Sequence, residues 1–221
     1  MAKPSKPQTP VSANNPCPFL RALVSEGRLA DNTEPLDKVA AVIAQTARTG
    51  EGSPALPAAA IFGIALIANG LGPAAMLKTK LHGLRLNALR GGPLDKQGVG
   101  SGILDSRGEV DPKELTRLRR FANKKRAADG ASELGLGLPE LRAFMDANFE
   151  RAAGRRRRID RALMIGEWPV LLKVMGKEGP DGRYLSLAEV EILFTQRRLP
   201  LRMSRRAVPK ANTAARSAEV A

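Results

Sequence analysis

Apolar residues recur at helical spacing along most of the chain, and proline, glycine and short polar turns separate the periodic segments. The helices that this pattern predicts begin at Pro18, Pro35, Ala58, Lys78, Pro112, Pro139, Ile159 and Leu187. We expect the helix from Pro112 to continue to about Arg126. Because no run of alternating apolar and polar residues indicates a strand, the sequence predicts an all-α fold.

The polar and low-complexity ends set the expected domain limits. Residues 1–13 are rich in proline, serine and lysine, and residues 203–221 form a basic tail. Such segments bury too little apolar surface to fold, so we expect both to be disordered. One helical domain is then expected over residues 14–202. Within it, residues 91–108 are rich in glycine and predict a long loop, which in compact domains is often functional.

One stretch carries no charge, because no charged residue lies between Glu51 and Lys78. A membrane-spanning helix needs about 20 apolar residues. The uninterrupted apolar run from Ala58 to Ala68 is shorter than this, so we expect a buried core helix there. Membrane association of residues 55–77 is the alternative interpretation.

Composition and charge limit the classes of partner. The chain has 221 residues, 43% of them apolar, and a net charge of +14. No apolar signal segment is visible near Met1, so a cytoplasmic location is expected. Basic residues gather at Arg119–Arg120, Lys124–Arg126 and Arg155–Arg158. A basic helical module for nucleic acid or an anionic membrane is therefore one hypothesis.

The only cysteine of the chain, Cys17, lies at the start of a predicted helix. Pro18 suits the first helical position, where its missing N–H has no partner to lose. Gly27 can end the helix. The exposed N–H groups and dipole of a helix N-terminus favour a thiolate, which can ligate a soft metal or attack an electrophile. A small buried apolar side chain is the alternative role for this residue.

The segment from Pro16 to Leu29 resembles the axial-ligand segment of the haem-thiolate peroxidases, the family of chloroperoxidases and unspecific peroxygenases. In that family it reads Pro-Cys-Pro-x-Leu-Asn-x-Leu-Ala-Asn-His-Gly-x-Leu. The positions that match are Pro16, Cys17, Pro18, Leu20, Leu23, Gly27 and Leu29, and those that depart are Arg21, Ser25 and Glu26. The resemblance implies a haem b that is not covalently attached, with Cys17 as its axial ligand and Pro18 beside it.

A second match lies near the C-terminus. Gly166-Glu167-Trp168, followed by residues 194–200, resembles the family's Gly-Glu pair and its later Phe-rich segment. The resemblance implies that Glu167 is the distal acid–base residue. The family often places an arginine two turns earlier, where this chain has Asp160, so Arg161 or Arg158 would orient Glu167.

A third family motif, Glu-His-Asp-x-Ser, holds a divalent metal beside a haem propionate. The nearest stretch here is Ile103-Leu104-Asp105-Ser106-Arg107. The resemblance leaves Asp105 and Ser106 as a weak Mg²⁺ site, and Arg107 as a partner for the propionate.

The resemblance as a whole implies a peroxidase or peroxygenase that uses hydrogen peroxide to oxidise or oxygenate a small organic substrate or a halide. The alternative within the family is a relative that binds haem but has lost catalysis. The departures at Ile103, Leu104 and Glu26 favour that alternative.

Overall fold

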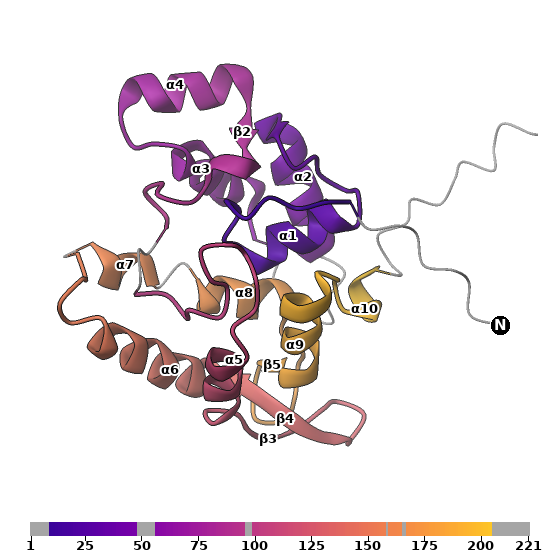
Figure 1. Ribbon diagram of the computed structural model, residues 1–221. Coiled ribbons are helices and arrows are strands. Elements are labelled where there is room, and N and C mark those ends of the chain that lie inside the picture. Colours follow the sequence, from indigo (N-terminus) through magenta and orange to yellow (C-terminus); the bar gives the residue numbers. More distant parts are fainter. Residues whose placement is uncertain (1–8, 48–55, 96–98, 158, 165–166, 205–221) are drawn as a thin grey trace, which may run out of the picture.

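A computed structural model describes residues 9–47, 56–95, 99–157, 159–164 and 167–204 (Figure 1). Its helices are α1 (Pro18–Ser25), α2 (Leu36–Ala47), α3 (Ala58–Ala68), α4 (Pro73–His82), α5 (Pro112–Arg119), α6 (Leu138–Arg151), α7 (Asp160–Met164), α8 (Trp168–Met175), α9 (Leu187–Gln196) and α10 (Leu201–Ser204). A single 3₁₀ turn, η1, covers Leu86–Ala88. Pro18 and Pro112 open helices at the positions that the sequence predicted, because an N–H in the first turn would have no partner within the helix. Pro73 opens α4, five residues before the predicted start at Lys78.

Two small antiparallel sheets show that the expected all-α fold is wrong. The strands are β1 (Thr33–Glu34), β2 (Leu84–Arg85), β3 (Asn123–Arg126), β4 (Ser132–Gly137) and β5 (Tyr184–Ser186). One sheet pairs β1 with β2, and the other has the order β3-β4-β5. The helix expected from Pro112 to about Arg126 therefore ends at Arg119, and its last residues form an edge strand instead.

The pattern of apolar and polar residues did not predict these strands, for reasons that their residues show. The edge strand β3 reads Asn-Lys-Lys-Arg, and charged residues of this kind are common on edges because they discourage pairing with other chains. In β4, Gly135 stands where a side chain would clash, because a Cβ there would lie 2.4 Å from Tyr184 Cδ2. Neither composition resembles the β-branched and aromatic residues that signal a strand.

A carboxylate inside the larger sheet joins its strands. The Oε1 atom of Glu133 accepts hydrogen bonds from Lys177 Nζ (2.7 Å) and Tyr184 OH (2.8 Å), and its Oε2 atom accepts one from Ser186 Oγ (2.5 Å). Burial raises the pKa of Tyr184, and the hydrogen bond to Glu133 acts in the same direction. These bonds satisfy two hydroxyls that are almost fully buried.

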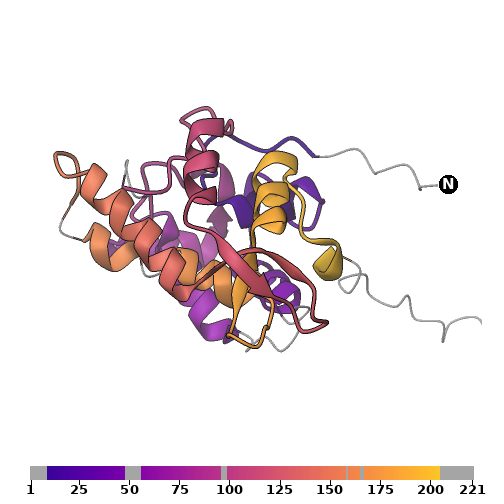
Figure 2. The same ribbon diagram turned by 90° about the horizontal axis from the view of Figure 1, so that it is seen from below.

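Aromatic side chains join the sheet region to the helices above it. The ring centroids of Phe121 and Phe144 lie 5.4 Å apart, those of Phe144 and Trp168 5.6 Å, and those of Trp168 and Phe194 6.2 Å. Helix α6 runs beside the β3–β4 hairpin, and α8 and α9 lie between this hairpin and α1 (Figures 1 and 2). This cluster therefore holds α8, which carries Trp168, at the centre of the fold.

The helix expected to be a buried core helix, Ala58–Ala68, is buried on one face only. Ile61, Ala65 and Ala68 point into the protein, whereas Ile64 is 44% exposed. The following helix, α4, buries only Thr79, and the chain then enters β2 rather than continuing as helix to Arg90. Among the described residues, no single helix is long and apolar enough to span a membrane; α3 and α4 pass that test together, with a bend of 116° between them.

Replacing Glu140 by Gln tests the bond between α6 and the edge strand. Burial alone would raise the pKa of Glu140, but hydrogen bonds from Asn123 and Lys125 (2.6 Å) lower it to about 2. We expect Glu140→Gln to lower the free energy of unfolding by about 1 kcal/mol at neutral pH. A carboxylate with a depressed pKa in the folded state stabilises above its unfolded pKa. The difference from wild type should therefore shrink as the pH falls from about 4.5 towards 2.

Urea unfolding at a series of pH values measures this difference. Glu150→Gln is the matched control, since Glu150 lies on the same helix with 75% of its side chain exposed, and we expect little change there. A loss of stability in Glu140→Gln that is the same at every pH would contradict the assignment.

Candidate functional site

A largely apolar cavity of about 460 Å³ lies between the start of α1, α2, α3 and α8. Its volume falls within the range of about 300–1,000 Å³ that is typical of small-molecule and cofactor sites. The wall is mostly aliphatic, with contributions from Val39 and Ile43 of α2 and from Val170 and Leu171 of α8. Its chemically active side chains are Cys17, Arg90, Asp95, Ser101 and Glu167.

Cys17 is held at the N-cap of α1 and lines this cavity. Its φ and ψ are −84° and 112°, and Pro18 follows at the start of the helix as expected. The Cys17 N–H donates to Asn15 Oδ1 (3.2 Å), and the Cys17 carbonyl accepts from the Arg21 N–H (2.9 Å). The backbone on both sides of the sulfur is thus fixed, and a helix start favours the thiolate form.

Arg21 is 2% exposed and ties this segment to a distant loop. Its Nη1 atom donates to the carbonyls of Ser12 (2.8 Å) and Asn15 (3.1 Å), and its Nη2 atom donates to the carbonyl of Gly108 (2.9 Å). Burial lowers the pKa of Arg21, and nearby arginines act in the same direction. The departure from the family's asparagine at this position therefore has a structural role.

Glu167 lies directly before α8 and lines the same cavity as Cys17. The Glu167 carbonyl accepts from the Leu171 N–H (3.0 Å), which fixes the backbone at the helix start. Trp168 follows it in the cavity wall and is only 1% exposed. The indole Nε1 of Trp168 has no hydrogen-bond partner among the described residues, which is rare for a buried donor.

Arg90 is a lining residue that the sequence analysis missed. Its Nε atom donates to the carbonyl of Ala13 (3.1 Å), and its Nη2 atom donates to the carbonyl of Asp105. Of the lining residues in the described part of the chain, it is the only lysine or arginine. The sequence signal that could have identified Arg90 is its position directly before the glycine-rich loop.

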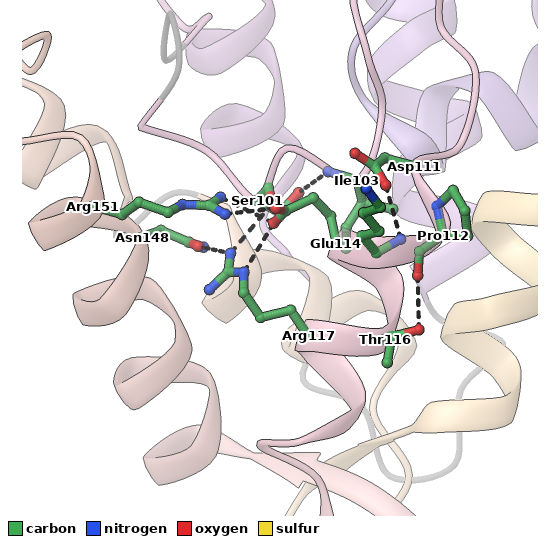
Figure 3. A network of polar contacts seen from close by, with 10 residues as sticks. Ser101, Ile103, Asp111, Pro112, Glu114, Thr116, Arg117, Asn148 and Arg151 are labelled. Carbon is green, nitrogen blue, oxygen red and sulfur yellow. Dashed lines mark hydrogen bonds and ion pairs between the residues drawn. The ribbon is translucent and has the colours of Figure 1, made fainter.

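The glycine-rich loop contributes Gly100, Ser101, Gly102 and Leu104 to the cavity wall. Side chains of α5 and α6 brace it from behind (Figure 3). Glu114 forms ion pairs with Arg117 (2.9 Å) and Arg151 (2.6 Å). Arg117 also donates to Asn148 and to the carbonyl of Ser101 in the loop (3.5 Å). The Asp111 N–H donates to the loop carbonyl of Ile103 (2.8 Å). The hydrogen bond from Arg151 lowers the pKa of Glu114, so the carboxylate stays charged within the brace.

The residues expected to form a magnesium site lie outside the cavity wall. The Oδ1 atom of Asp105 accepts from the N–H groups of Arg107 and Glu109, both at 2.8 Å, and the bond from Glu109 lowers the pKa of Asp105 most. Arg107 is 77% exposed and pairs with Asp105 and Glu109 rather than facing the cavity. Ser106 belongs to the same turn. In the described ranges, no three His, Cys, Asp or Glu side chains gather to hold a metal ion.

The two arginines expected beside Glu167 are not brought to it by the described structure. Arg161 Nη1 pairs with Asp146 Oδ1 at 2.5 Å, with more than half of each side chain exposed. Arg158 lies outside the described residues. Two basic residues of α5 and β3 likewise have carboxylate partners, since Arg119 pairs with Glu191 and Lys125 with Glu140.

Comparisons with protein-family models, with curated proteins and with solved structures find no match to this chain.

The chain contains a single cysteine and a single tryptophan, and both line the cavity. A nitroxide attached to Cys17 should therefore quench the fluorescence of Trp168 strongly, and chemical reduction of the nitroxide should restore it. The control is Cys17→Ser combined with Ala74→Cys, which moves the label to an exposed position on α4. Equal emission from the two labelled proteins would show that Cys17 and Trp168 do not share a cavity.

Proposed function

We propose that the protein is a haem-thiolate peroxidase or peroxygenase, which uses hydrogen peroxide to oxidise or oxygenate a small organic substrate or a halide. One observation carries the proposal. Cys17 and Glu167, which the family resemblance singled out from opposite ends of the chain, both line one largely apolar cavity. The proposed thiolate ligand and the proposed acid–base group thus face the same enclosed space.

The residues of the cavity suit a haem b. The aliphatic walls from α2, α3 and α8 match a flat apolar macrocycle, and Cys17 at the start of α1 would be its axial ligand. The guanidinium of Arg90, in the same wall, is the cation available to pair with a propionate. When bound, a haem with thiolate ligation supplies the electron density that favours cleavage of the peroxide O–O bond.

Glu167 would move the proton during this cleavage. A carboxylate here can accept the proton from one oxygen of hydrogen peroxide and return it to the leaving oxygen, which is general acid–base catalysis. Trp168 and Leu171, which are mostly apolar, line the cavity beside Glu167. Since Arg161 pairs with Asp146, the proposal assigns proton transfer to Glu167 and no role to Arg161.

A protein that binds haem without catalysis is the second candidate. The observation that favours it is that the side chains of Arg161 and Asp105, both expected near the haem, bond to residues outside the cavity wall. Peroxide-dependent turnover separates the two candidates, because only the first requires Glu167.

The test uses the full chain loaded with haem and a dye substrate. We expect Glu167→Gln to lower peroxide-dependent turnover by about 10²- to 10⁴-fold, the contribution of a general acid–base group, with no change in the haem absorption spectrum. Glu150→Gln, at an exposed position of α6, is the control and should retain activity. A haem-loaded wild type without turnover would support the second candidate, and failure to bind haem would exclude both.

A further inference from the structure

Helices α3 and α4 present an apolar surface that the other described residues leave uncovered. Ile64, Leu71, Leu77 and Leu81 are 44%, 55%, 56% and 68% exposed, and they are four of the seven large apolar side chains exposed in the described residues. We call these four residues the α3–α4 face. Large apolar patches on a protein surface usually mark an interaction site.

Two of these residues share one side of α4, and the other two lie on α3 and in the turn between the helices. Leu77 and Leu81 are four residues apart, one helical turn, while Ile64 is on α3 and Leu71 lies between the end of α3 and the start of α4. Helix α4 forms the outer edge of the molecule, and α3 lies between it and the rest of the fold (Figure 1). Only Thr79 of α4 is buried, so its apolar side chains have little role in the core.

The charged residues of the segment that carries this face have one sign. From Gly52 to Leu94 the sequence contains no Asp or Glu, although it contains Lys78, Lys80, Arg85 and Arg90. The side chains of Lys78, Lys80 and Arg85 are exposed, beside the leucines of α4 or in the strand that follows it. An apolar centre with a cationic rim is typical of protein surfaces that lie in the interface of an anionic bilayer.

We propose that the α3–α4 face docks on anionic lipid bilayers. The leucines would enter the boundary between headgroups and acyl chains, and the three exposed cations would meet lipid phosphates and carboxylates. A second copy of the chain is a poorer occupant, because a two-fold interface would bring these cations close to their own copies.

Docking would also set the cavity beside the bilayer. Ile64 belongs both to the α3–α4 face and to the cavity wall, and Ile61 and Ala65 of the same helix continue that wall inward. Docking itself needs no cofactor, so its test is independent of the function proposed above.

The experiment measures sedimentation of the full chain, without added haem, with vesicles of phosphatidylcholine alone or mixed with phosphatidylserine. We expect binding to the mixed vesicles that weakens with salt. Leu77→Asn with Leu81→Asn should weaken it at least about tenfold, from the lost apolar burial. Lys78→Gln and Lys80→Gln should each weaken it about fivefold. Leu134→Asn, 48% exposed on β4, is the matched control and should bind as wild type does.

Three outcomes would overturn the proposal. If the leucine substitutions leave binding to the mixed vesicles unchanged, the binding is due to charge alone, including the charge of the basic C-terminal segment. The absence of binding to either vesicle would exclude docking. A dimer in solution that Leu77→Asn with Leu81→Asn abolishes, without vesicle binding, would assign the face to a second copy.

Discussion

The arrangement of the site depends on the buried guanidinium of Arg21. Removing a charge from water is costly, and no carboxylate in the described part of the chain bonds to this guanidinium. The three carbonyls that accept its hydrogen bonds therefore offset the cost. Those carbonyls belong to the segment before Cys17 and to Gly108. The same side chain therefore sets the start of α1 against the end of the glycine-rich loop. Moving either segment would leave a buried charge without acceptors.

The cavity follows from this constraint and from two further supports. The Arg117–Glu114–Arg151 network holds the wall formed by the glycine-rich loop, and the aromatic cluster around Trp168 holds the start of α8. A thiol and a carboxylate from opposite ends of the chain consequently line one space. A largely apolar cavity of about 460 Å³ has the size that is typical of small-molecule and cofactor sites.

Local chemistry made some of the structure predictable from the sequence. Pro18 and Pro112 mark helix starts, and Gly27, with a φ of +71°, follows the end of α1. Strands β3 and β4 were not predictable, since β3 consists mostly of charged residues, β4 contains two glycines, and the pairing of β4 with β5 joins segments far apart in the chain.

At the site, the short motifs singled out Cys17 and Glu167, which both line the cavity, but they did not single out Arg90, and they placed Arg161 at a site that it does not line. Tertiary contacts decide which cation lines the cavity. Arg90 is held there by hydrogen bonds to the carbonyls of Ala13 and Asp105, whereas Arg161 forms an ion pair with Asp146 outside the cavity wall.

The central claim is that Cys17 ligates a haem iron as a thiolate. The most direct measurement is the absorption spectrum of the reduced, carbon monoxide-bound, haem-loaded protein. A thiolate-type Soret band in the wild type that is lost in Cys17→Ala is the predicted result, and a band that is the same in both proteins would contradict it.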